Sequence, residues 1–149
     1  MLVKTSLLRI VSPPDIRAAM WWKCITVSVN GCVYALTQSA MRGVMRNAAT
    51  IHMIEAALKE GCEVAAAHGV ALNADVLVSS FKGKMLALID VNGSAKPSMT
   101  RDIEAGRQSE YEAQIGVLFK MAKEKPVSVP VIDTLYALLL PLIASKGTQ

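Results

Sequence analysis

Residues 96–116 read KPSMTRDIEAGRQSEYEAQIG, and this stretch decides how the chain is organised. Ser98 follows a proline and precedes two acidic residues, which predicts a short helix that stops at Gly106. Ser109 and Glu110 begin a capping-box pattern, which predicts the start of a second helix. Backbone N–H groups at a helix start are unpaired and carry partial positive charge. We therefore expect Ser98 and Glu110 to be either structural caps or part of a site for a small carboxylate.

Helical periodicity continues on both sides of this stretch. Residues 47–68 repeat apolar side chains at helical spacing and are followed by Gly69, a typical helix stop. Residues 73–91 form a second segment of this kind. Pro130 opens a last helix that is apolar nearly all round, so we expect this helix to be buried in the core or at a subunit interface.

The first part of the chain predicts one further helix and an interruption. Residues 1–11 are short and partly β-branched, and we expect them to be extended. Ser12 before a proline predicts a helix start. The β-branched run 25–29 and the pair Asn30-Gly31 predict a kink, a break or a short strand. Five to seven helices with almost no sheet place the chain in the all-α class, as a single helical domain over residues 1–149.

The composition excludes several classes of protein. The chain has 149 residues, of which 52% are hydrophobic and 19% charged, so we expect one folded domain and no intrinsic disorder. The net charge of +4 comes from scattered basic residues without a basic face, which disfavours a helical DNA-binding protein. Polar residues and prolines interrupt the apolar stretch 127–144, and no signal-peptide pattern is present. We expect no membrane span and a cytoplasmic location.

Sequence motifs for cofactors and metals are missing from these 149 residues. There is no GxGxxG and no GxxxxGK[ST] pattern, so nothing in the sequence indicates a nucleotide phosphate site. The three cysteines form no CxxC pair, and the two histidines are not paired with carboxylates at ligand spacing. We therefore expect the chain alone to bind no cofactor and no metal.

Lys23 is the second candidate for chemistry. It follows Met20, Trp21 and Trp22 on a mostly apolar helix. A lysine in this setting either extends its ammonium group to solvent or is partly buried and suited to act as a general acid near neutral pH. The residue types alone leave both possibilities open.

The chain resembles the C-terminal domain of the ketopantoate reductase (2-dehydropantoate 2-reductase) family. Its residues that match the family pattern are Ser98-Met99, Arg101-Asp102-Ile103, Gly106-Arg107, Ser109-Glu110 and Gly116. The spacing of twelve positions between the serine and the glutamate agrees with the family. Upstream, Asp15-Ile16-Arg17 followed by Trp22-Lys23 is similar to the family's Asp-Ile-Arg and Trp-x-Lys motifs. The resemblance covers residues 12–145, nearly the whole chain.

The resemblance implies a helical bundle of the 6-phosphogluconate dehydrogenase C-terminal-domain type. It implies that Lys23 is the general acid for the ketone of a small 2-keto acid, with hydride from NADPH, in pantothenate biosynthesis. It places Glu110 with Lys23 in the catalytic set and Ser98 among the substrate-binding residues. It also implies a homo-oligomer, most simply a dimer.

The sequence departs from the family in two ways: one domain is absent from these residues, and two asparagines are replaced. The family's N-terminal Rossmann domain is absent from these residues, so NADPH is expected only through a separate nucleotide-binding domain. The asparagine four positions after the family's lysine is Val27 here, and the one eight positions after it is Gly31. Asn30, one position off, is the remaining candidate for a substrate-binding amide. Two functions follow: a substrate-binding and dimerising domain of a reductase, or a non-catalytic helical dimerisation or interaction module derived from that family.

Overall fold

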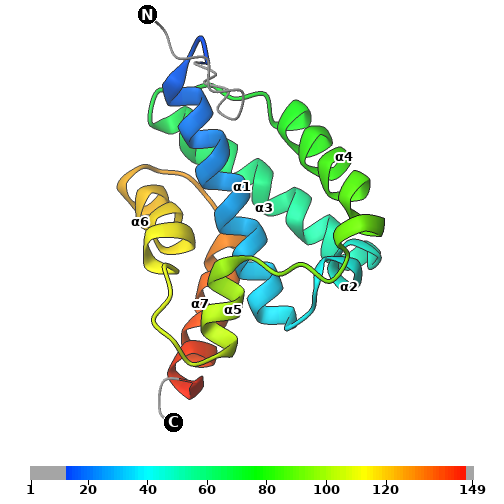
Figure 1. Cartoon of the computed structure of the whole chain (residues 1–149). Helices are drawn as coiled ribbons and strands as arrows, with labels where there is room; N and C mark the ends of the chain where they lie inside the picture. Colours follow the sequence, from blue (N-terminus) through cyan, green and yellow to red (C-terminus); the bar gives the residue numbers. More distant parts are fainter. Residues whose placement is uncertain (1–12, 147–149) are drawn as a thin grey trace, which may run out of the picture.

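The computed structural model describes residues 13–146, and every regular element in this range is a helix (Figure 1). The all-α class is therefore confirmed; the extended segment expected over residues 1–11 lies outside the described range. The elements are α1 (Ile16–Thr37), α2 (Met41–Met45), α3 (Ala48–Ala67), α4 (Ala74–Asn92), α5 (Ser98–Glu104), the π-helix η1 (Glu112–Gly116), α6 (Val117–Glu124) and α7 (Pro130–Lys146).

Helix α1 begins three residues later than the sequence predicts. Its N-cap is Asp15, whose carboxylate Oδ1 accepts a hydrogen bond from the backbone N–H of Ala18 at 3.0 Å. A start at Ser12 would require Pro13 to be helical, and a residue that precedes a proline is disfavoured in the helical region. The expectation that Ser12 caps this helix is wrong, and Asp15 takes that role.

Helix α1 also runs without a break through the β-branched residues and Asn30-Gly31. The side chains of Ile25, Val29 and Val33 are fully buried against the surrounding helices. Burial of this extent outweighs the weak helix propensity of β-branched residues, because propensity differences amount to only about 0.7 kcal/mol per residue. The predicted kink or strand is wrong for this reason.

Helix α1 is the centre of the domain and packs against α3, α5, α7 and η1. Figure 1 shows it running through the middle of the molecule, with α4 on one side and α6 on the other. Helix α4 packs instead on α2 and α3. Ion pairs of Glu55 with Lys82 and of Lys59 with Asp75 join α4 to α3. Helix α4 is thus held by α2 and α3 and lies beside α1 without packing closely against it.

Two contacts of α3 fix its neighbours. At Gly61, a Cβ atom would lie 2.6 Å from Cγ2 of Ile25, so the glycine permits the close crossing of α1 and α3. The carboxylate of Glu60 accepts hydrogen bonds from the backbone N–H groups of Val131, at 2.9 Å, and Ile132, at 2.8 Å. Glu60 therefore caps the start of α7 from a different helix, and its negative charge suits the positive end of that helix.

The last helix is only partly covered. Ile132, Leu135 and Leu139 are buried, whereas Leu138 and Leu140 are 55% and 40% exposed. The helix continues past Pro141 to Lys146. No helix in residues 13–146 is both long enough and apolar enough to cross a membrane.

Alkaline pH is expected to destabilise the fold. Burial raises the pKa of the Cys32 thiol and that of the Tyr34 phenol to about 12 each. The unfolded chain loses these protons near about pH 8.5 and about pH 10, so stability is full below the first value and is lost progressively toward pH 12. The urea midpoint should fall as the pH rises, and the fall should be smaller in Cys32→Ala. A midpoint that is constant up to about pH 11 would contradict this expectation.

Candidate functional site

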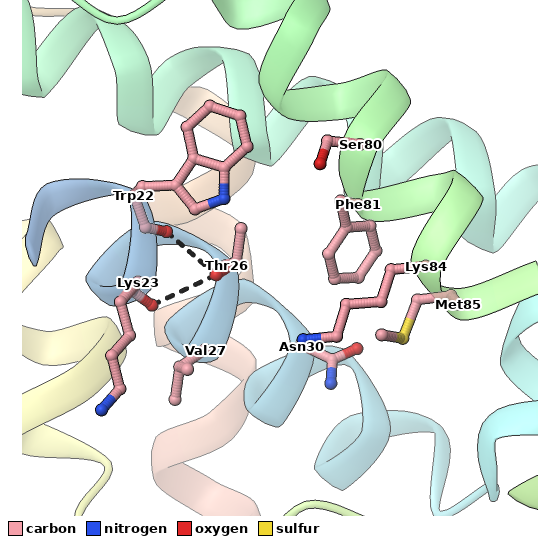
Figure 2. A pocket seen from close by; sticks show the side chains of 9 residues that line it. All are labelled: Trp22, Lys23, Thr26, Val27, Asn30, Ser80, Phe81, Lys84 and Met85. Atoms are coloured by element: carbon pink, nitrogen blue, oxygen red, sulfur yellow. Dashed lines mark hydrogen bonds between the residues drawn. The ribbon is translucent and has the colours of Figure 1, made fainter. Parts of the chain in front are cut away.

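A cleft of about 450 Å³ lies between α1 and α4 (Figure 2). Its apolar walls come from both helices and its polar groups include one lysine from each. The lining residues are Trp22, Lys23, Thr26, Val27, Asn30, Ser80, Phe81, Lys84 and Met85. A volume of this size falls within the range of about 300–1,000 Å³ that is typical of small-molecule sites.

A second groove, of about 320 Å³, lies on the other side of α1 and faces η1. It shares Lys23 and Val27 with the cleft and adds Gln114 from η1. Residues four apart lie on one face of a helix. Lys23 and Val27 therefore form a ridge between the two hollows, where a bound molecule would contact both.

The ammonium group of Lys23 is free to meet a ligand. The residue is exposed, and it forms no ion pair with any residue of the described range 13–146. In Figure 2 its side chain extends away from Phe81 and Lys84. Of the two arrangements left open by the sequence, the exposed one is found, so a role as general acid requires a bound molecule to cover the ammonium group.

The neighbouring polar groups on α1 differ in what they can offer. The Thr26 hydroxyl donates within its own helix, to the carbonyl oxygens of Trp22 at 2.9 Å and Lys23 at 3.2 Å. Asn30 lines the cleft, and its Oδ1 is buried without a hydrogen-bond partner among the described residues. A buried polar atom of this kind is uncommon and indicates an unfilled interaction. Val27, which lines the cleft together with Thr26 and Asn30, has only methyl groups and offers no hydrogen bond to a ligand.

Gly31 lies beneath two long side chains of neighbouring elements. A Cβ atom at this position would lie 2.9 Å from Cε of Met99 and 3.2 Å from Oε1 of Gln114. The Thr100 hydroxyl donates a hydrogen bond to the Gly31 carbonyl oxygen at 3.2 Å. The absence of a side chain at Gly31 thus lets the start of α5 and the middle of η1 pack directly on α1.

Ser98 does not cap its helix, contrary to the prediction. Pro97 is the N-cap, with an extended backbone (φ −55°, ψ 154°), and Ser98 is the first helical residue. The proline side chain has no acceptor atom, so the start of this helix makes no side-chain capping bond. The Ser98 side chain is exposed, next to the buried Met99.

Glu110 likewise does not open an α-helix with a capping box. The element that follows is η1, with Tyr111 as its N-cap and no side-chain capping bond. The N–H of Gly116 donates to the carbonyl oxygen of Tyr111 at 3.0 Å, five residues back, as in a π-turn. Glu110 is exposed, and its Oε2 accepts a hydrogen bond from Nε2 of Gln114 at 3.4 Å.

The predicted site residues thus fall on two sides of the ridge. Lys23 and Asn30 line the cleft together. Glu110 reaches the second groove through its hydrogen bond to Gln114, whereas Ser98 lines neither hollow. Neither Ser98 nor Glu110 lines the cleft.

Most lining residues were not predicted from the sequence, and Gln114 and Lys84 are two with groups that can bind a ligand. Gln114 stands four positions after Glu110, a spacing that could have indicated the contact on a helix. No sequence pattern could have indicated Lys84, because its position opposite α1 depends on how α4 packs on the other helices. Within residues 13–146 no cluster of three or more His, Cys, Asp or Glu side chains is arranged to hold a metal ion.

Comparisons with known proteins identify the family of this helical domain. The family model described as ketopantoate reductase PanE/ApbA C terminal matches residues 15–142. The chain belongs to this family. It is 26% identical over 127 residues to the uncharacterized oxidoreductase YkpB of Bacillus subtilis, covering 85% of this chain and 41% of that protein. The chain spans about two fifths of the length of the curated relatives it matches.

Solved structures give the same family and fold. The dimeric ketopantoate reductase from Staphylococcus aureus is 25% identical and superimposes with a TM-score of 0.81, over 94% of this chain and 48% of the other. A D-mandelate dehydrogenase solved with NADH and anilino(oxo)acetate has a TM-score of 0.82 at 18% identity, over 91% of this chain and 55% of the other. The second likeness concerns the fold alone.

Proposed function

We propose that this chain is the substrate-binding and dimerising helical domain of a ketopantoate-reductase-like oxidoreductase that acts on a small 2-keto acid. The observation that carries the proposal is the unpaired ammonium group of Lys23 on a ridge between two hollows. In this function Lys23 donates a proton to the ketone oxygen of the substrate, which is general acid catalysis. Family membership over residues 15–142 supports the match of Lys23 to the family's lysine.

The other candidate residues have supporting roles in the proposal. Asn30 offers its amide to the substrate in the cleft, and Ser98 offers its exposed hydroxyl at the start of α5. Glu110 belongs to the catalytic set, and its hydrogen bond to Gln114 connects its charge to the groove beside Lys23. Val27 supplies no polar contact, so the substrate is held by fewer amides than the family pattern implies.

NADPH is the expected source of the hydride in this reaction. The described residues contain no strand, glycine-rich turn and helix in sequence, which is the unit that holds a dinucleotide pyrophosphate. The residues present therefore do not fit the cofactor, and we assign it to a separate nucleotide-binding domain. The purified chain alone is expected to show no NADPH oxidation; steady turnover proportional to its concentration would overturn this assignment.

Titration with ketopantoate and related 2-keto acids tests the proposed function. The chain is expected to bind them saturably, and Lys23→Ala is expected to weaken binding about tenfold or more, because a charged hydrogen bond is lost. Lys125→Ala is the matched control, since Lys125 is also exposed but lies away from both hollows. Equal affinities for the Lys23 variant and the unaltered chain would contradict the role of Lys23.

Dimerisation is the second part of the proposal. The exposed Leu138 and Leu140 on α7 favour it, because the same helix already buries its other face in the core. Sedimentation at tens of micromolar is expected to give a homodimer, and a clean monomer would contradict it. Cys24, Cys32 and Cys62 are free thiols, which suits the reducing cytoplasm that we propose as its location.

The non-catalytic interaction module is the alternative, and Val27 at the centre of the ridge is the observation that favours it. Both functions predict a dimer. They differ in ligand binding: the module is expected to dimerise normally and to bind no 2-keto acid up to millimolar concentration.

A further inference from the structure

We propose that Gln114 of η1 binds a hydroxyl group of the substrate, in the groove that it shares with Lys23. The inference rests on the function proposed above. It adds a substrate-binding residue and narrows the substrate to a small 2-keto acid that carries a hydroxyl group. The groove concerned is the one of about 320 Å³ on the η1 side of α1.

The amide of Gln114 lies over the middle of α1. Its Oε1 is 3.2 Å from the position that a Cβ atom would take at Gly31. Gly31 stands eight residues after Lys23, which is about 12 Å along the helix, and Val27 stands halfway between them. Position 31 carries an asparagine in the family pattern, so Gln114 brings an amide to this place from a different element. The groove thus has an ammonium group and an amide with an apolar side chain between them.

The hydrogen bonds of this amide leave an acceptor available. Nε2 of Gln114 donates to Oε2 of Glu110 at 3.4 Å, which engages the donor side of the amide. Oε1 is buried and has no hydrogen-bond partner among the described residues. A buried acceptor without a partner is uncommon, and a donor group on a ligand would satisfy it. The last torsion of a glutamine side chain is broad, so the amide can turn this oxygen toward the groove.

The other groups of the groove define the donor. In the described lining the charged residue is Lys23, with no aspartate or glutamate, so a cationic donor is disfavoured and a neutral hydroxyl fits. Ser28 also lines the groove, but it is 1% exposed and its hydroxyl interacts with the Cys24 thiol. Gln114 is half-buried and is therefore the more accessible of the two neutral polar residues. Val27 offers its methyl groups to the carbon atoms between the ketone and the hydroxyl.

The experiment compares two ligands that differ in this hydroxyl alone. Ketopantoate carries it, and trimethylpyruvate is the same keto acid with a methyl group in place of the hydroxymethyl group. Both are titrated by calorimetry into the full chain and into Gln114→Ala, with circular dichroism to verify folding. We expect the unaltered chain to bind ketopantoate more tightly. Gln114→Ala should weaken ketopantoate binding about tenfold and leave trimethylpyruvate binding unchanged, because one hydrogen bond is lost.

Two further variants separate the amide from the fold. Gln108→Ala is the matched control, because Gln108 is exposed and lines neither the cleft nor the groove. Gly31→Asn in the Gln114→Ala background returns an amide to the same place from α1. The remaining close neighbour of the new side chain is Cε of Met99, at 2.9 Å, which is the end of a flexible side chain. This double variant should recover most of the ketopantoate affinity that Gln114→Ala loses.

Each other outcome has a definite meaning. If Gln114→Ala weakens both ligands equally, or neither, Gln114 does not bind the hydroxyl, and the proposed function stands without it. If the double variant binds ketopantoate no better than Gln114→Ala, an amide at this place does not serve the substrate and the inference is overturned. If the unaltered chain binds neither ligand, the proposed function fails and this inference fails with it.

Discussion

Replacing Glu60 with alanine is expected to lower the free energy of unfolding by about 2–4 kcal/mol, because two charge-assisted hydrogen bonds in a buried setting are lost. The carboxylate satisfies the backbone N–H groups of Val131 and Ile132, and Pro130, the first residue of α7, has no N–H of its own. Without Glu60 both donors lose their acceptor, and the Ile132 N–H is left unpaired in a buried position. Urea unfolding measures the loss, and we expect a clear fall in the midpoint with an unchanged slope.

Glu63 provides the matched control for Glu60. It lies three positions further along α3 and is exposed, so Glu63→Ala is expected to change stability by no more than about 0.5 kcal/mol. Glu60→Gln keeps one acceptor oxygen and should fall between the two. If Glu60→Ala proves as stable as Glu63→Ala, the cap on α7 does not stabilise the domain.

Replacing Gly61 with alanine is expected to destabilise the domain by about 1–3 kcal/mol, although alanine favours a helix more than glycine does. The new methyl group would lie 2.6 Å from Cγ2 of Ile25, and the Ile25 side chain is fully buried. A β-branched side chain next to its own helix has little freedom to move away, so α1 and α3 must separate. Thermal unfolding should show a lower midpoint temperature.

Gly83 tests the same substitution without the clash. It lies inside α4, and nothing lies within 4 Å of the position its Cβ would take. Gly83→Ala is therefore expected to stabilise the domain by about 0.5–1 kcal/mol through helix propensity alone. We expect the change in the free energy of unfolding to have opposite signs in the two variants. The same sign in both would mean that α1 and α3 leave room for a methyl group at Gly61.

Helix boundaries were predictable where the signal is local. The helices expected over residues 47–68 and 73–91 are found, and the side chains of Asn47 and Asn73 accept hydrogen bonds from the backbone at their starts. Gly69 and Gly106 adopt positive φ angles of 80° and 66°, which glycine reaches without strain and which end the preceding helices. These caps and helix stops depend on residues only a few positions apart, so they can be predicted from the sequence alone.

Boundaries that depend on distant residues were not predictable. The continuity of α1 results from burial of Val29 and its neighbours by the helices packed around α1. The start of α7 depends partly on Glu60, about seventy residues away along the chain. The capping-box pattern at Ser109 is followed by a π-helix, in which five-residue hydrogen bonds replace the expected ones. Local patterns carry no information about such contacts.

The candidate site was predictable only along α1. The resemblance to the family selected Lys23 and, one position off the family pattern, Asn30, and both line the cleft. Lys84 was missed because the separation of α4 from α1 is set by packing on α2 and α3. Gln114 was missed because its approach to Gly31 requires the π-helix.

The central helix has consequences for how this domain evolves. Buried residues such as Ile25 and Val29 hold the fold, whereas Lys23 and Val27 on the same helix face outward. Substitutions at outward positions change stability by only about 0.5 kcal/mol, so selection for folding hardly acts on them. The outward face of α1 can therefore change in sequence while the architecture persists, and Val27, 41% exposed, occupies one of these weakly constrained positions.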